Sequence, residues 1–411
     1  MGKISFDLNQ FLQAVSFAID FVEMDILQAS RNHSKRVAYI ALCLAENLGL
    51  SEAERSDIIV FSIMHDSGLC EESLLSNQDF RKLRQLRRME TFSQHCEFGE
   101  KNIAAYPLRS KASNIIKYHH ENWDGSGFFG LAGKQIPLLA QIIGMADFVD
   151  NLFHFETGER QKIAKYLKYM SGKRFSPQIV EAYFQVSAHT RFWLDLKNEF
   201  IGYALQRKTI PNQQLLSWSE IYQIIEVFTT IIDSKSHFTG RHSKQIVAKT
   251  ILACDYYQIE GDERIKLKIA AALHDLGKLA MPDKILEKAS DLDRSEMRHM
   301  KTHTYYTKLA LSLVDHFAGI KEWAGNHHEK LNGMGYPEGL KADQLSFKSR
   351  LLSCVDLYQA LTEDRPYRPK MSPQKAFDIM QKMVKNGYID QDIVENFIAD
   401  LVQKDGADSP K

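Results

Sequence analysis

The feature of this chain that most constrains its fold is an internal repeat with a period of about 200 residues. The segment His33-Ser34-Lys35 returns 209 residues later as His242-Ser243-Lys244, and the pair His65-Asp66 returns at the same offset as His274-Asp275. Polar positions that keep their order over the length of a domain indicate a duplicated structural unit. We therefore expect two tandem domains rather than one large core.

The repeat includes a set of five histidines and two aspartates in each half of the chain. A single buried histidine is more often a core residue with satisfied hydrogen bonds than a metal ligand. Seven such residues that recur in order are typical of a metal site, because histidine and aspartate are ligands for divalent zinc, iron and manganese. The first set is His33, His65, Asp66, His95, His119, His120 and Asp147, and the second set is His242, His274, Asp275, His303, His327, His328 and Asp356.

An adjacent His-Asp pair, such as His274-Asp275, suits a site that holds two metal ions. The carboxylate can bridge both ions while the imidazole binds one of them. Two ions about 3.5 to 4 Å apart can activate a water and hold a phosphate for in-line attack. The pattern therefore favours phosphoester hydrolysis.

Apolar residues recur every three or four positions, which predicts helices almost throughout. The pattern is clearest in residues 221–232, 40–48 and 246–254, and strand-like alternation is scarce. Glycine-rich segments at 124–127 and 332–335 mark loops. We predict an all-α chain.

The polar run around Pro211 interrupts the helical pattern between the two repeats. It predicts a linker at residues 206–216, which would separate a first domain at 1–205 from a second domain at 217–411.

The charge balance excludes a broad basic surface for duplex nucleic acid. Lys plus Arg and Asp plus Glu both number 52, so any phosphate must be bound by local groups. No apolar stretch reaches the roughly 18 residues of a membrane span, and the amino terminus has no signal-peptide pattern. The five cysteines form no C-x-x-C pair, as expected of reduced thiols. We expect a cytoplasmic protein with no membrane partner.

Motifs of the second half resemble one known family. They are the segment Ala272-Leu273-His274-Asp275-Leu276-Gly277-Lys278, then Pro282-Asp283, His327-His328-Glu329, Gly335-Tyr336-Pro337 and Arg365-Pro366-Tyr367-Arg368. From about residue 233 to about residue 380 the chain resembles the HD-GYP group of HD phosphohydrolases. The resemblance implies a helical bundle around a two- or three-metal centre that hydrolyses 3′,5′-cyclic dinucleotides.

The resemblance also assigns roles within the second half. The seven histidines and aspartates of the second set would be ligands, with Asp275 as the bridge. Lys278 follows His274 by four residues, so a helix would place both on one face, and the lysine would stabilise charge on the scissile phosphate. A surface lysine is the alternative.

Arginines and a glycine loop complete the expected substrate site. By resemblance, Arg365 and Arg368 would bind phosphate through forked hydrogen bonds, although arginines in loops are otherwise usually solvated. The loop residues Gly335, Tyr336 and Pro337 would contact substrate, with Tyr336 against a base, or form a structural loop only.

Three positions depart from the family pattern. Phe238 stands where many members carry a further metal-binding acid, which favours two metals over three. The last ligand, Asp356, is followed by Gln359 in place of a second acid, and the usual aspartate of the glycine loop is Asn332. Substrate preference or rate is therefore expected to differ from the family pattern.

The first half keeps its seven candidate ligands but has lost other parts of the motif. Leu69 stands at the position of Lys278, Phe128-Phe129 replaces Tyr336-Pro337, and no Arg-Pro-Tyr segment follows Asp147. We predict a degenerate HD domain with a regulatory or structural role and a candidate metal site. The alternative is a second activity on a smaller phosphoester.

The sequence predicts a cyclic dinucleotide phosphodiesterase that acts on 3′,3′-cGAMP or cyclic di-GMP. The alternatives are a non-enzymatic cyclic dinucleotide sensor and an HD hydrolase of other nucleotides. The expected cofactors are two divalent ions in the second domain, and the ligand types do not distinguish iron, manganese, zinc and nickel. The oligomeric state is open, with a homodimer as one option.

Overall fold

A computed structural model describes residues 2–20, 24, 29–69, 89–152, 159–234, 242–286, 288–364 and 368–407. The chain forms two compact units, and each has its own buried core. The first-repeat unit is Ser5–Gln214, and the second-repeat unit is Leu215–Lys411 together with Met1–Ile4. Among the described residues, no helix is both long and apolar enough to cross a membrane.

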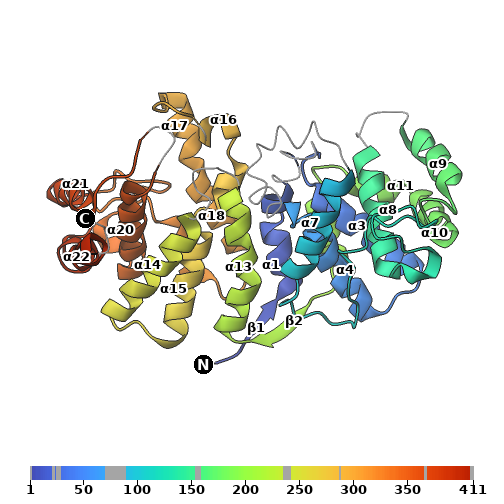
Figure 1. Cartoon of the computed structure of the whole chain (residues 1–411), viewed down its shortest axis with the longest axis horizontal. Helices are drawn as coiled ribbons and strands as arrows, with labels where there is room; N and C mark the ends of the chain where they lie inside the picture. Colours follow the sequence, from blue (N-terminus) through green and yellow to red (C-terminus); the bar gives the residue numbers. More distant parts are fainter. Residues whose placement is uncertain are drawn as a thin grey trace. The chain divides into compact units, whose positions relative to one another are not determined.

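The first-repeat unit is built almost entirely of helices (Figure 1), and α3 packs against both α4 and α8. Its helices are α1 (Leu8–Val15), α3 (His33–Asn47), α4 (Glu52–Met64), α7 (Met89–Asn102), the 3₁₀ helix η1 (Gly133–Gln135), α8 (Leu138–Leu152), α9 (Glu159–Met170), α10 (Pro177–Ser187), α11 (Thr190–Asp195) and α12 (Ile201–Lys208).

The second-repeat unit is also helical, and α14 packs against α15 and α20 (Figure 1). Its helices are α13 (Trp218–Ser234), α14 (His242–Tyr256), α15 (Gly261–Leu273), the 3₁₀ helix η2 (Leu276–Ala280), α16 (Asp283–Leu286), α17 (Arg294–Met300), α18 (Thr302–Ser312), α19 (Ala318–Gly325), the 3₁₀ helix η3 (Ala342–Gln344), α20 (Phe347–Thr362), α21 (Pro373–Lys385), the π-helix η4 (Ile393–Ile398) and α22 (Ala399–Ala407).

The repeat in the sequence is a repeat in the fold. Helices α14 and α15 begin and end 209 residues after α3 and α4, and α20 begins 209 residues after α8. The duplicated helices therefore carry the duplicated polar residues in equivalent places, and the expectation of a mostly helical chain with two similar domains is confirmed.

Local sequence signals explain where several of these helices begin. Ser51 caps α4, because its hydroxyl accepts the Glu54 N–H while the Glu54 carboxylate accepts the Ser51 N–H. Ser346 accepts the Ser349 N–H in the same way at the start of α20. In α13, Ile221 and Phe228 are among the residues that bury the apolar stripe expected at 221–232.

Two short strands lie at the division between the repeats. Strand β1 (Ile4–Asp7) pairs with β2 (Gln213–Leu216) in a two-stranded sheet. The expected linker at 206–216 thus contains the end of α12 and all of β2, and the units divide within it, after Gln214. Four-residue strands 209 residues apart give little alternation from which to predict their pairing.

Candidate metal centres

The second-repeat unit brings its seven candidate ligands together from five elements. His242 is the first residue of α14, and Asp356 lies on α20. The pair His274-Asp275 follows the end of α15. His303 lies on α18, and the pair His327-His328 follows α19. All but His328 are buried.

Asp275 lies between two groups of imidazoles. Its Oδ2 atom is 3.2 Å from the Nε2 atom of His274 and 3.7 Å from the Nε2 atom of His242. Its Oδ1 atom is 3.6 Å from His303 Nε2 and 3.9 Å from His327 Nε2. A carboxylate with histidine nitrogens around each oxygen has the arrangement of a ligand between two ions.

The donor atoms fit metal ions better than they fit one another. The Nε2 atoms of His242 and His274 and the Oδ1 atom of Asp275 are buried without a hydrogen-bond partner. Buried polar atoms without a hydrogen-bond partner are rare in folded proteins, because burying them unpaired costs free energy. The trios His242, His274 and Asp356, and His303, His327 and His328, each hold their donor atoms within 4.8 Å of one another.

Backbone carbonyls orient three of these imidazoles. The Nδ1 atoms of His274, His303 and His327 lie 2.8, 2.7 and 2.6 Å from the carbonyl oxygens three residues earlier in the chain. A donated Nδ1–H leaves Nε2 as the metal-binding atom and fixes the direction of the ring. The local turn of the backbone is therefore sufficient to direct the Nε2 atom of each ring toward the other candidate ligands.

Burial and neighbouring charge keep His303, His328 and Asp275 in metal-binding protonation states. Burial lowers the pKa of His303 to about 3 and that of His328 to about 4, so both rings are neutral at pH 7. Burial opposes ionisation of Asp275, but the charges of His274 and Lys278 outweigh it and hold the pKa of the carboxyl well below its usual range.

The acid missing at Gln359 has a replacement one turn later. The Nδ1 atom of His242 lies 2.9 Å from the carboxylate of Glu363, and the Gln359 side chain donates to the same carboxylate at 2.9 Å. Burial opposes protonation of His242, but Asp356 and Glu363 raise its pKa to about 9. Glu363 was not predicted from the sequence. It could have been found as a carboxylate four residues after Gln359, the position where the family pattern has an acid.

Lys278 reaches the centre by a different local structure from the one expected. Helix α15 ends at Leu273, so His274 and Lys278 do not share an α-helix, and the lysine lies on the 3₁₀ helix η2. In a 3₁₀ helix, side chains three residues apart align. Lys278 Nζ accordingly donates to Asp275 Oδ2 at 2.6 Å. Its side chain is 20% exposed, so the ammonium group lies at the open side of the cluster.

Gly277 lets η2 approach the helix that carries His303. A Cβ atom at Gly277 would lie 1.9 Å from the His303 carbonyl oxygen, which leaves no room for any side chain. Thr307 fixes the same contact, since its hydroxyl accepts the Gly277 N–H at 2.9 Å and donates to the His274 carbonyl at 3.1 Å.

Glu329 holds the glycine loop of the second-repeat unit in place, and Tyr336 in this loop lies beside the candidate ligand His328. The Glu329 carboxylate accepts three backbone N–H groups of residues 338–340 at 2.7 to 3.1 Å. A Cβ atom at Gly335 would lie 2.3 Å from the Lys330 nitrogen, and the peptide bond to Pro337 is cis. The Tyr336 ring lies 5.0 Å from the His328 ring, and burial raises the pKa of its hydroxyl.

Of the two arginines expected to bind phosphate, the structure describes Arg368 only. Arg368 donates from Nη1 and Nη2 to the carbonyls of Leu361 and Ala360, near the end of α20. These bonds satisfy carbonyls that a helix end leaves open. Arg365 and the substituted position Phe238 lie outside the described residues.

The first-repeat unit gathers its seven candidate ligands in the same way. Asp66 Oδ2 lies 3.6 Å from His65 Nε2, and Asp66 Oδ1 lies 3.4 Å from His95 Nε2 and 3.8 Å from His119 Nε2. His33 Nε2 lies 3.3 Å from an oxygen of Asp147. Cys96 Sγ lies 3.4 Å from His95 Nε2 and His120 belongs to the same group, so a thiol adjoins these imidazoles.

The surroundings of this first centre differ from those of the second. The first histidine, His33, is oriented directly by Asp150 at 2.6 Å, and Arg36 donates to the same carboxylate at 2.5 and 2.9 Å. Leu69, at the position of Lys278, is buried at 4% exposure. The Glu121 carboxylate accepts two backbone N–H groups, of residues 129 and 131, so the glycine loop is held as in the second unit.

Comparisons with known proteins agree with this duplicated architecture. Residues 31–152 and residues 226–393 each match a family described as an HD domain. The 3′3′-cGAMP-specific phosphodiesterase 1 of Vibrio cholerae serotype O1 is 28% identical over 409 residues, which are 97% of this chain and 92% of that protein. A cyclic di-GMP phosphodiesterase of Pseudomonas aeruginosa is 29% identical over 168 residues, 41% of this chain and 40% of that protein.

A solved structure shares the fold over its whole length. The crystal structure of the Vibrio cholerae cyclic GMP-AMP phosphodiesterase V-cGAP3 aligns with 99% of this chain and 99% of its own, with a TM-score of 0.68 and 24% sequence identity. Both HD-domain matches contain a gathered set of histidines and aspartates. The chain therefore belongs to the HD-GYP family of HD phosphohydrolases and has an HD domain in each half.

Proposed function

We propose that the second-repeat unit is a metal-dependent phosphodiesterase that linearises a cyclic dinucleotide, with 3′,3′-cGAMP ahead of cyclic di-GMP as substrate. The observation that carries the proposal is the position of Lys278. Its ammonium group is 2.6 Å from Asp275, the carboxylate at the middle of the ligand set, and is partly open to solvent. A fixed positive charge beside two metal subsites suits a phosphate in transfer.

The ligand set would hold two ions, with Asp275 between them. In that position the ions would supply the Lewis acidity that lowers the pKa of a water and neutralises the charge of a phosphate. The chain's own contribution is orientation. Glu363 and the backbone carbonyls hold the imidazole rings in place, so that the site needs little reorganisation when substrate binds.

Lys278 would act on the phosphate itself. When metal ligation occupies the Asp275 carboxylate, the lysine ammonium has donors left for a phosphate oxygen and stabilises the charge that develops there. Arg365, which follows α20 in the sequence, would bind the ground-state phosphate. Arg368 would support the end of α20, since its guanidinium is bonded to the carbonyls of Leu361 and Ala360.

The glycine loop would shape the entrance to this site. The close approach of Gly335 to residues 329 and 330 and the position of Tyr336 over His328 place the loop beside the ligands. A base or sugar of the substrate would contact the open face of this loop, together with Pro337.

The substrate preference rests on the extent of the similarity to known proteins. Two Vibrio cholerae 3′3′-cGAMP-specific phosphodiesterases align with 97% and 93% of the chain and therefore with both repeats. The cyclic di-GMP phosphodiesterases of Pseudomonas aeruginosa and Thermotoga maritima align with 41% and 43% of it. A third 3′3′-cGAMP-specific phosphodiesterase of the same organism aligns with 36% of the chain, so the support for 3′,3′-cGAMP comes from the two matches that include both repeats.

The test is a panel of cyclic and linear dinucleotides incubated with the metal-loaded chain, with products separated by chromatography. We expect cyclic substrates to disappear in favour of linear dinucleotides, fastest for 3′,3′-cGAMP, and we expect chelation of the metal to stop the reaction. Saturable binding without turnover would instead identify a sensor. Hydrolysis of free nucleotides alone would identify a different HD hydrolase.

A further inference from the structure

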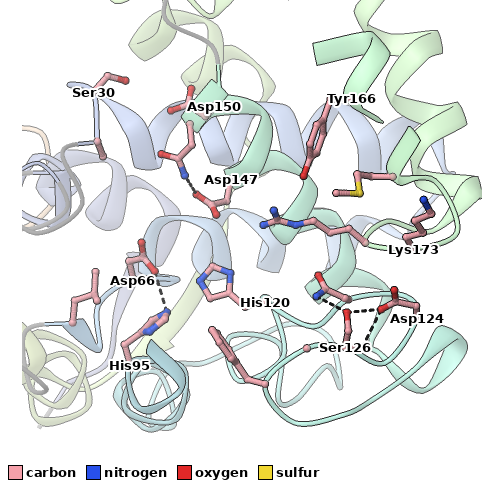
Figure 2. Close-up of a pocket in the computed structure, with 18 residues that line it drawn as sticks. Ser30, Asp66, His95, His120, Asp124, Ser126, Asp147, Asp150, Tyr166 and Lys173 are labelled. Atoms are coloured by element: carbon pink, nitrogen blue, oxygen red, sulfur yellow. Dashed lines mark hydrogen bonds and ion pairs between the residues drawn. The ribbon is translucent and has the colours of Figure 1, made fainter. Parts of the chain in front are cut away.

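A cavity of about 910 Å³ opens onto the metal centre of the first-repeat unit (Figure 2). Four candidate ligands line it, namely Asp66, His95, His120 and Asp147. Figure 2 shows them on one side, with Tyr166 and Lys173 across the cavity. A space of this size, with polar groups converging on one wall, is typical of a small-molecule site.

The cavity also contains an arginine side chain. Arg174 lines it and is half-buried. Its guanidinium lies 4.5 Å from the ring of Phe148, which directly follows the ligand Asp147 on α8. Among the residues that the structure describes, Arg174 forms no ion pair with a carboxylate. An arginine held against a ring with its donors open is suited to bind a phosphate.

Arg174 has no basic counterpart in the other repeat. The carbonyl of Arg174 accepts the Trp123 N–H at 3.1 Å, and the carbonyl of Tyr388 accepts the Leu331 N–H at 3.0 Å. Trp123 and Leu331 are separated by the 208-residue offset of the neighbouring histidines, so Arg174 and Tyr388 are equivalent positions. The second repeat thus has Lys278 and Tyr388 where the first has Leu69 and Arg174.

The rest of the cavity offers surfaces for a nucleoside. Phe128 lies edge-on to the His120 ring at 5.8 Å, and Tyr166 stacks on Phe148 at 4.9 Å. Both Phe128 and Tyr166 line the cavity, so aromatic faces are available to a base on two sides. Asn122 and Ser126 add polar groups that can bind a sugar hydroxyl.

We propose that the first-repeat unit is a second nucleotide-binding site, which takes a nucleotide with a terminal phosphate. The phosphate binds between Arg174 and the His and Asp cluster, and the base lies against Phe128 or Tyr166. This site goes beyond the function proposed for the second repeat and does not depend on it. In the second repeat the cation beside the candidate ligands is Lys278, whereas in the first repeat it is Arg174, in the segment after α9.

The test is calorimetric titration of guanosine 5′-monophosphate into the full-length, metal-loaded chain that carries Asp275→Ala, which disables the second centre. We expect one saturable site per chain. Arg174→Met in the same background removes the charge but keeps apolar contact with Phe148. It should weaken binding by about tenfold to a hundredfold, the scale of one hydrogen bond to a charged group.

Matched variants separate this site from general electrostatic attraction. Lys173→Gln removes a neighbouring charge that lies 3.9 Å over the exposed Tyr169 ring, and should weaken binding by less than about fivefold. Asp66→Ala should abolish binding. If the melting temperature shows that Arg174→Met does not fold, Arg174→Gln removes the same charge.

Three results would overturn the proposal. They are no saturable binding in the Asp275→Ala chain, equal affinity with and without the Arg174 charge, and binding that persists when Asp66 is removed. Titration with inorganic phosphate separates the two parts of the ligand. Phosphate that binds as tightly as the nucleotide would refute the base contacts, and weaker binding of phosphate supports them.

Discussion

The two repeats of this chain hold the same seven candidate ligands, and they differ in the charges around them. In the second repeat, Lys278 contacts Asp275, and the candidate ligand His242 is oriented by Glu363. In the first repeat, Leu69 replaces the lysine and Asp150 orients the histidine. The arrangement of the candidate ligands is therefore shared by two repeats whose neighbouring positive charge differs, so metal binding and phosphate recognition can be tested separately in this chain.

The largest expected effect comes from removing the carboxylate between the two subsites of the second repeat. Asp275→Ala should reduce cyclic dinucleotide hydrolysis to background, because both subsites lose an oxygen ligand. Product chromatography measures the loss, and elemental analysis should show less metal per chain. Substantial activity in this variant would mean that the working site lies elsewhere.

Lys278 should matter almost as much, without affecting the metals. Lys278→Ala should lower kcat by about 10²-fold or more, the scale of removing one preorganised donor. Metal content by elemental analysis should stay at the parental level, which distinguishes this variant from Asp275→Ala. If kcat is unchanged, the lysine is a surface charge, and the main chemical difference between the repeats loses its meaning.

Glu363 is expected to act through His242 rather than on substrate. Glu363→Gln should weaken metal binding in the second repeat or lower turnover by about tenfold to a hundredfold, as is typical when a group that orients a metal ligand is changed. Competition with a chelator measures the affinity, and added metal should restore turnover.

The matching variant of the first repeat is Asp150→Asn, which removes the charge that orients His33. It should weaken metal binding there and leave cyclic dinucleotide turnover near the parental rate. Equal losses of turnover in the two variants would contradict a division of labour between the repeats.

The sequence was sufficient to predict the features that repeat. The candidate ligands keep their spacing in both repeats, so the 208- and 209-residue offsets identify His303 and Asp356 without a structure. The ring of His303, for example, is oriented by a carbonyl three residues earlier in the chain. The apolar period predicted helical segments at 40–48 and 246–254, which α3 and α14 largely contain, but it did not give the first residues of these helices, His33 and His242. Features that depend on residues close together in the sequence can be predicted well from sequence patterns.

The features that were missed depend on contacts between distant segments. The bond between His242 and Glu363 joins residues 121 positions apart, and only the folded chain shows that Glu363 compensates for Gln359. Arg174 gains its place only once α9 and α8 pack against each other. The expected α-helical alignment of His274 with Lys278 was wrong, because α15 ends before the ligand pair and a 3₁₀ helix follows.

Arg365 tests phosphate recognition in the second repeat apart from catalysis. Arg365→Ala should chiefly raise KM and leave kcat near the parental value, because an arginine that contacts substrate equally in the ground and transition states contributes uniform binding. Steady-state kinetics on 3′,3′-cGAMP separate the two constants. A large fall in kcat at unchanged KM would place Arg365 with Lys278 among the groups that stabilise the transition state.

The smallest effect is expected from Asp66→Ala, the counterpart of Asp275→Ala in the first repeat. Cyclic dinucleotide hydrolysis should stay within about tenfold of the parental rate, or about 1.4 kcal/mol in the activation barrier. The reason is that Leu69 leaves Asp66 without the lysine that Asp275 has, although the distances from Asp66 to its histidines are similar. The metal content of the chain should nevertheless fall, because the first centre loses its bridging carboxylate. A fall in turnover as large as that of Asp275→Ala, in a variant whose melting temperature shows that it is folded, would assign catalysis to the first repeat and reverse the comparison.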